Sequence, residues 1–215
     1  MALTLIEPPE DDPVSLEEAK DHCRFPYDDE DNLIVGLIKA ATASVEKHTG
    51  LALITQTWEY RRDEFERPLL LTDATLTGTR PIRIPISPIQ SVNSFSYVDA
   101  DGETTVLYDS VGSPVVDTGE IAIDLHSRPA RIVPLANVTW PTSMYAANSL
   151  VIQVVAGFGD HPDSVPAPLK QAILLLVGHW FQNRGTMAEV SSRSMVEIPN
   201  GISFLIDPYR EPVFA

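Results

Sequence analysis

Helical sequence patterns stand at the two ends of this chain, and a long strand-like stretch lies between them. The first helical stretch covers residues 15–50 and the second covers residues 165–185. Neither stretch has enough apolar surface to fold alone, so we expect the two to pack together into one small core. The residues between them would then form an insertion that the helical core carries.

The first helical stretch contains signals for where its helices begin and end. Ser15 followed by Glu18 fits a capping box, in which the serine oxygen accepts a backbone N–H and the glutamate reaches back. Pro26 ends this first short helix, because proline forces the residue before it into extended geometry. In the second helix, Gly50 suits a left-handed cap, and the apolar stripe at helical spacing consists of Leu33, Ile34, Leu37, Ile38, Ala41 and Val45.

The middle of the chain has the alternation and the turn residues of β-strands. Residues 92–98 and 104–108 predict a hairpin whose turn is formed by residues 99–102. Prolines in the stretch 81–86 place it at a sheet edge or in a connector. The strongest strand pattern is at residues 150–156. Short strands separated by turns predict a small antiparallel sheet or sandwich.

The last helix is apolar on more than one side. Pro166 and Pro168 open it, as proline does at first-turn positions. A helix that is apolar nearly all round is buried on several faces, either in a core or at a subunit interface. The candidate residues for a subunit interface are Leu174, Leu175 and Trp180.

Charge and cysteine content exclude several classes of protein. The 30 acidic and 15 basic residues give a formal net charge of −15, which argues against nonspecific binding to nucleic acid or to anionic membranes. Cys23 is the only cysteine, so no intrachain disulfide forms, as in a reducing cytoplasm. The sequence has no signal-peptide pattern and no run of about 20 apolar residues. We therefore expect a soluble protein that does not associate with membranes.

Catalytic and metal-binding motifs are missing from the sequence. The five histidines are scattered, with no pair at the i, i+4 spacing of a helical zinc site. Residues 99–103 resemble part of a calcium loop, but strands flank them, which favours a hairpin tip. The acidic run 28–31 suits the start of a helix, where the macrodipole favours carboxylates. We expect no catalytic residue, no cofactor and no metal ion.

Several segments, in order along the chain, carry a family resemblance. They are VSLEEAKDHCRF at residues 14–25, DDEDNLIVGLIKAATASVEKHTGLAL at 28–53, QTW at 56–58, LKQAI at 169–173, HWFQNR at 179–184 and LIDPYR at 205–210. Together they resemble the head–tail connector proteins, also called adaptor or head-completion proteins, of tailed phages and gene transfer agents. The similarity is to the larger members, which have a β insertion.

This resemblance implies a structural role. Such connectors form a ring, commonly of twelve subunits, in the neck of a virion or phage-like particle that is assembled in the bacterial host cytoplasm. The ring lies between the portal protein and the stopper or tail-terminator proteins, and it extends the channel through which DNA passes. Twelve copies would carry a charge on the order of −180, so a lumen-facing part would repel DNA and let it slide. Family members are not enzymes.

Residue patterns and resemblance together predict an α+β fold. Its small helical core consists of residues 13–51 and the C-terminal helix at 165–185, and the inserted antiparallel β subdomain covers 52–160. Residues 186–215 would form an extended C-terminal docking tail.

The resemblance also nominates a docking site, because the C-terminal segment of such adaptors commonly engages the portal. Carried onto this chain, the candidates are Ile202, Phe204, Leu205, Ile206, Tyr209 and Arg210. This apolar segment lies far along the chain from the core helix, so we expect it to seek a partner. A strand that completes the protein's own sheet is the alternative. Truncation before Gly201 should then leave a folded monomer that no longer docks.

Two other functions stay open at this point. The chain could be a neck or tail-completion protein that binds a tail terminator and not the portal. It could also be a hydrolase whose site forms in the β region from His126, Asp124 and Glu120.

Overall fold

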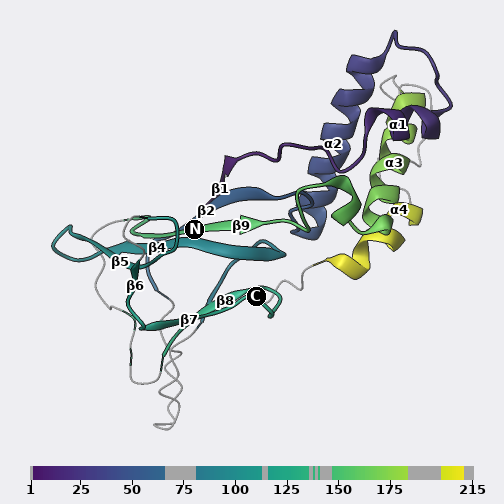
Figure 1. The fold of residues 1–215 in the computed structure, drawn as a ribbon. Helices are drawn as coiled ribbons and strands as arrows, with labels where there is room; N and C mark the ends of the chain where they lie inside the picture. Colours follow the sequence, from purple (N-terminus) through teal and green to yellow (C-terminus); the bar gives the residue numbers. More distant parts are fainter. Residues whose placement is uncertain are drawn as a thin grey trace. The chain divides into compact units, whose positions relative to one another are not determined.

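The computed structural model describes residues 2–65, 81–112, 116–135, 138, 140, 147–183 and 200–210. The chain divides into two units. The first contains Met1–Pro8 and Thr55–Gly157, and the second contains Pro9–Ile54 and Phe158–Ala215. Strands build the first unit and helices build most of the second (Figure 1).

The second unit begins with the two helices that the sequence predicts, α1 (Leu16–Cys23) and α2 (Asp31–Thr49). The capping box of α1 is confirmed: Ser15 Oγ accepts the Glu18 N–H at 3.1 Å, and Glu18 Oε2 accepts the Ser15 N–H at 2.9 Å. The end of α2 is confirmed as well. Gly50 is left-handed there, with φ of 75°, and its N–H donates to the Glu46 carbonyl.

Helix α3 (Ala167–Gln182) is the centre of this unit, and its first turn contains Pro168. Helices α1, α2 and α4 (Asn200–Ile206) all pack against α3. The apolar residues on several sides of α3 are therefore covered mainly within the subunit. The core that results contains Val14, Ala19, Ile34, Ile38, Ala41, Val45, Leu51, Leu53, Ile54, Val165, Leu169, Ala172, Ile173, Leu176, Val177, Ile202 and Ile206.

Helix α4 corrects the expectation for the C-terminal segment. Residues 200–210 form α4 and the 3-10 helix η2 (Asp207–Tyr209), not an extended stretch and not a strand. The segment was expected to lie too far from the core helix to pack on it, but Ile202 is 2% exposed and Ile206 is 1% exposed. Distance along the sequence does not limit distance in space, and a helix places residues i and i+4 on one face. The rest of the predicted tail, 186–199 and 211–215, lies outside the described residues.

The first unit contains a six-stranded antiparallel sheet in the order β1-β2-β9-β4-β5-β6. These strands are β1 (Ala2–Glu7), β2 (Gln56–Arg62), β9 (Leu150–Ala156), β4 (Ile89–Val98), β5 (Thr104–Asp109) and β6 (Val116–Asp117). The predicted hairpin is confirmed as β4 and β5, and the strongest predicted strand is β9, which lies between β2 and β4. Alternate β9 residues are buried, as expected for a strand with one face on a core.

A three-stranded sheet completes the first unit, in the order β3-β8-β7. Its strands are β3 (Ile82–Arg83), β8 (Arg131–Pro134) and β7 (Ile121–Asp124), and β3 lies at the edge, as its prolines predicted. Phe65 stacks on Trp140 with ring centroids 4.8 Å apart, and Phe95 of β4 contacts both rings edge-on. The first unit thus has a core of its own.

Candidate docking surface

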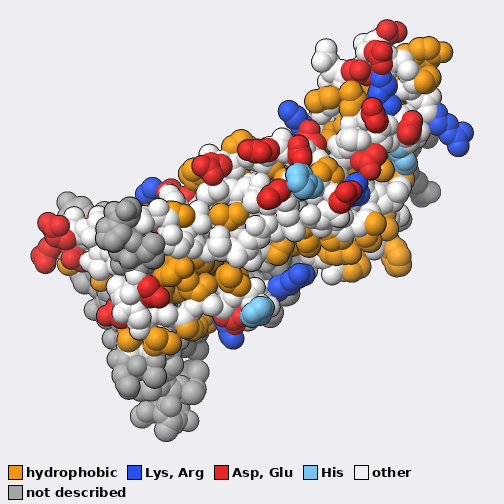
Figure 2. Space-filling view, in the orientation of Figure 1, with side chains coloured by type: hydrophobic (Ala, Val, Ile, Leu, Met, Phe, Trp, Pro, Cys, Tyr) orange, Lys and Arg blue, Asp and Glu red, His pale blue; other side chains and the backbone are white. Residues whose placement is uncertain are grey.

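Helix α4 has two faces with opposite environments. Ile202 and Ile206 are buried in the core of the second unit, and Leu205 and Tyr209 pack against the same core while remaining partly exposed. Phe204 points away and is 81% exposed, the largest exposed fraction of any large apolar side chain in the described residues. Figure 2 shows hydrophobic side chains gathered on the surface over α4. The segment therefore presents an aromatic ring from a helix that the core holds in place.

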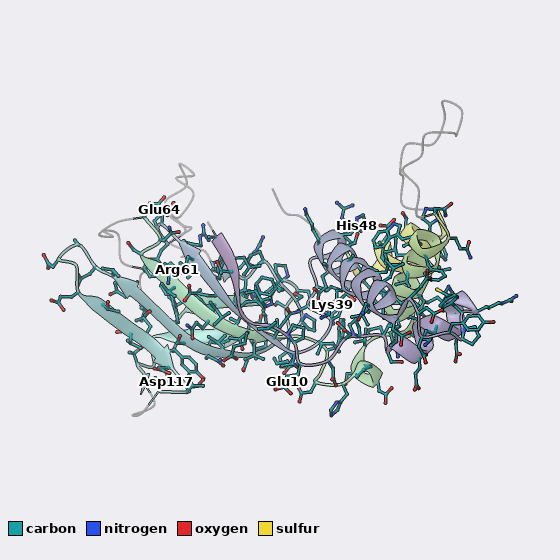
Figure 3. The ribbon with its side chains drawn as sticks, turned by 90° about the horizontal axis from the view of Figure 1, so that it is seen from above. Glu10, Lys39, His48, Arg61, Glu64 and Asp117 are labelled. Atoms are coloured by element: carbon teal, nitrogen blue, oxygen red, sulfur yellow. The ribbon has the colours of Figure 1, made fainter. Side chains whose placement is uncertain are left out.

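Polar contacts fix the end of this segment. Asp207 Oδ1 lies 3.4 Å from Nε2 of His48, which belongs to the last turn of α2 and is labelled in Figure 3. The Arg210 N–H donates to the Asp207 carbonyl at 3.1 Å and closes η2. The side chain of Arg210 is exposed, so its charge is available beside the docking candidate.

The structure separates the six docking candidates into two groups. Ile202 and Ile206 are removed as anchors for a partner, because a side chain buried in its own subunit cannot also enter a partner's pocket. Phe204 and Arg210 remain accessible. The sequence already held the signal for this division: positions 202, 205, 206 and 209 have the i, i+3, i+4, i+7 spacing of a helix face, which leaves Phe204 on the other side.

The three candidates for a subunit interface are partly used inside the subunit. Leu174, Leu175 and Trp180 of α3 are neither fully buried nor exposed, and all three pack against the core of the second unit. The surplus apolar surface expected on α3 is therefore smaller than the sequence indicated. A contact between their exposed parts and a neighbouring subunit stays a prediction.

The acidic start of α2 already has a cation from the chain itself. Lys20 Nζ lies 2.6 Å from Asp28 Oδ1 and 2.8 Å from Asp31 Oδ1, which ties α1 to the start of α2. The Lys20 ammonium lowers the pKa of Asp28, and Asp28 and Asp31 raise the pKa of Lys20. Acidic side chains gather around this end of the helices in Figure 2. Their pattern is explained by helix contacts inside the subunit.

Asp124, one of the three residues considered for a hydrolase site, is used to hold a turn together. Asp124 accepts the backbone N–H of His126 at 3.0 Å, the Ser127 hydroxyl at 2.6 Å and the Arg131 Nε–H at 2.9 Å. These donors, with the Ser127 hydroxyl first, hold the pKa of Asp124 far below its ordinary value of 3.8. A carboxylate so stabilised is a weak base, and here it organises the turn after β7. His126 and Glu120 are exposed.

The predicted hairpin tip is built by one aspartate. Asp99 Oδ1 accepts the N–H groups of Asp101 at 2.9 Å and Glu103 at 3.0 Å, and Gly102 takes a left-handed φ of 86°. These contacts satisfy the turn without an ion. Within the described ranges, no three His, Cys, Asp or Glu side chains are grouped in a way that could hold a metal ion.

Comparison with protein-family models identifies the family. The model described as "Phage gp6-like head-tail connector protein" matches residues 13–96 and 143–210. The chain belongs to this head–tail connector family. The matched residues include the four α-helices found in the described residues, with Phe204 and Arg210. The resemblance that the sequence segments carried is confirmed.

Solved structures share the fold of this connector. A structure titled "Virion of native gene transfer agent (GTA) particle" superposes with a TM-score of 0.72 at 20% identity, covering 100% of this chain and 98% of that chain. "Neck of empty GTA particle computed with C6 symmetry" gives 0.70 at 24% identity, and "Neck of native GTA particle computed with C12 symmetry" gives 0.71 at 21%, both with the same coverage. Among curated proteins none matches the sequence.

In the part of the chain that the structure describes, no helix has both the length and the apolarity that a membrane span requires.

Proposed function

We propose that this connector is one subunit of a ring in the neck of a phage or gene transfer agent particle, and that α4 docks the ring on the portal protein. The observation that carries the docking proposal is Phe204, which is 81% exposed on a helix whose other large apolar side chains pack into the core. The family match, which includes α4, and the likeness to neck structures computed with C6 and C12 symmetry support the ring.

An exposed aromatic ring on a fixed helix has the properties of an interface anchor. Aromatic residues dominate binding energies when they enter a pocket on the partner, and they lose little conformational entropy because they have few rotatable bonds. Arg210 is exposed six residues further along and can add a charge-assisted hydrogen bond at the rim. The portal surface that receives α4 would therefore be an apolar pocket beside a carboxylate or a backbone carbonyl.

The role we propose requires no catalysis and no cofactor. A connector ring acts through its shape, its contacts and the charge of its channel. The stopper or tail-terminator proteins would bind the side of the ring that faces the tail, and DNA would pass through the channel without specific binding. The net charge of −15 for each subunit supports this, because a wall with excess carboxylates does not hold phosphates.

A pulldown with the portal protein tests the docking surface. Phe204→Ser should lower portal binding at least tenfold, because the aromatic anchor is lost. Tyr27→Ser is the matched control, since Tyr27 is also an exposed aromatic, at 63%, but lies before α2 and outside α4. Both variants should keep the thermal unfolding midpoint of the unchanged protein within a few degrees.

Three results would contradict the proposal. Portal binding that survives Phe204→Ser would remove α4 as the docking element. Equal losses in both variants would show a general surface effect and not an anchor. Binding of the unchanged protein to a tail terminator, with no binding to the portal, would favour the tail-completion role instead.

A further inference from the structure

The six-stranded sheet has two open edges in the described residues. β1 lies at one end of the strand order and pairs only with β2. At the other end, β6 contains two residues and pairs only with Tyr108 and Asp109 of β5. The Leu107 carbonyl accepts the Thr118 N–H, so the free part of the β5 edge is residues 104–106. Figure 1 shows β1 and β5 at the two sides of this sheet.

Neither free segment, residues 2–6 of β1 or residues 104–106 of β5, contains a charged residue or a proline. Natural sheets protect an open edge with charged residues, especially lysine, or with proline, because unpaired N–H and C=O groups recruit other strands. The β1 edge reads Ala-Leu-Thr-Leu-Ile before its first charge at Glu7, and the β5 edge reads Thr-Thr-Val. Leu5 is 40% exposed, Ile6 is 47% exposed, and on the far side Val106 is 37% exposed. These segments are suited to pairing with another chain.

Neither edge belongs to the part of the chain that the family model matches. That match begins at residue 13, after β1, and it omits residues 97–142, which include β5 and β6. The central strands β2 and β9 lie within the match. The family match therefore does not assign these edges a role.

We propose that the β1 edge of one subunit pairs with residues 104–106 of β5 in the next copy, so that the sheets join around the ring. This inference rests on the proposed ring. A cyclic ring of more than two copies joins two different surfaces of each subunit, because each interface is head-to-tail. Pairing of β1 with β1 would be self-complementary and would end at a dimer. One sheet with two different open edges supplies the two complementary surfaces that a ring needs.

The sheet register indicates which side chains would meet. Directly opposed residues lie on the same face of a sheet, and so do residues two apart in a strand. The chain of pairs that links the two edges on one face is Thr4↔Glu59, Glu59↔Gln153, Gln153↔Ser94 and, two residues along, Ser96↔Val106. Thr4 and Val106 therefore lie on the same face of the sheet. If adjacent sheets join, these two side chains project from neighbouring edges on one side.

Cysteine crosslinking of assembled rings tests this pairing. The native cysteine is first removed by Cys23→Ser. Thr4→Cys and Val106→Cys are then introduced in this background, each alone and both together. A second double variant, Thr4→Cys/Thr104→Cys, covers a shift of register by two residues. A disulfide forms only if the two Cα atoms come within about 7 Å. Upon oxidation, at least one double variant should give a ladder of multimers that ends at the complete ring. Each single variant should form no disulfide between subunits and should run as a monomer on a denaturing gel.

A charge at the edge gives an independent readout. Leu5→Lys should reduce the fraction of subunits in rings at least tenfold, because the ammonium protects the edge from pairing. Leu135→Lys is the matched control, since Leu135 is 43% exposed in the same unit but follows β8 of the other sheet. The control should assemble normally, and circular dichroism should show that both variants are folded.

The possible outcomes separate a failure of the edge pairing from a failure of the proposed ring. Electron microscopy of the unchanged protein in particles comes first, and a neck without a ring of this chain would contradict the proposed function. If the ring is present but both double variants stay monomeric and Leu5→Lys assembles normally, the edge pairing is wrong. Dimers from Thr4→Cys alone would also overturn it, because they would show β1 paired with β1.

Discussion

Two residues of α4 show how neighbouring apolar side chains take different roles. Ile202 is 2% exposed and belongs to the core of the second unit, whereas Phe204, two positions later, is 81% exposed. A helix turns by about 100° per residue, so positions two apart point to nearly opposite sides. Hydrophobicity alone therefore does not identify a docking residue, and the helical period must be read with it.

Stability measurements on single alanine variants check this division. Ile202→Ala should lower the free energy of unfolding by about 2–5 kcal/mol, because it removes a buried side chain and leaves a cavity. Phe204→Ala should change that free energy by less than about 0.5 kcal/mol, because the ring already faces water. Urea unfolding of both variants at pH 7 gives the comparison. Equal losses of stability would mean that Phe204 also packs within the subunit.

Glu18 gives a prediction about pH. The Ser15 N–H and then the Lys170 ammonium hold the pKa of Glu18 below its ordinary value of 4.5. A carboxyl with a lowered pKa in the folded state contributes stability above its unfolded pKa and loses that contribution as pH falls through the folded value. The contribution of Glu18 to the free energy of unfolding should therefore stay level from pH 7 to about pH 5 and decline below pH 4.5.

The Glu18→Gln variant isolates this contribution. Glutamine keeps the capping geometry but removes the ion pair with Lys170, whose Nζ lies 2.9 Å from Glu18 Oε1. Because Glu18 is exposed, the loss at pH 7 should be below about 1 kcal/mol. The difference between the variant and the unchanged protein should shrink as pH falls below 4.5. A difference that grows in acid would contradict this role for Glu18.

At the scale of elements, the sequence predicted the helices and strands that have capping residues, turn residues or a clear apolar period. Ser15 with Glu18 and Gly50 mark helix ends, and the hairpin of β4 and β5 has its turn residues in place. β1 was missed because it has six residues, only Leu3 is even partly buried, and its partner β2 begins about fifty residues later. α4 was missed although its apolar positions have helical spacing, because the local pattern does not show that α3 covers this face.

Truncation tests the status of α4. The sequence suggested that removal of the residues from Gly201 onward would leave a stable monomer. The structure predicts a loss of about 3 kcal/mol or more in the free energy of unfolding, because Ile202 and Ile206 leave the core and expose α3. Thermal unfolding of the chain ending at Asn200 would show the change. An unchanged midpoint would mean that α4 is only loosely attached.

At the scale of the whole molecule, the net charge of −15 for each subunit gives a prediction about DNA. A purified ring should not bind duplex DNA measurably at 50 mM salt, since strong electrostatic binding needs clustered cations. A gel-shift or fluorescence-anisotropy titration with a 30-base-pair duplex measures this. Tight binding that weakens steeply with added salt would contradict a repelling channel and would indicate a basic surface on the ring.

Electron microscopy of purified particles is the most direct test of the central claim, that this chain is a connector subunit in the neck. The account predicts a ring of this chain between the portal and the tail, with the first residues of each subunit beside the β4–β5 hairpin of its neighbour and α4 against the portal. Particles whose neck is complete without this chain, or in which the chain lies elsewhere, would contradict it.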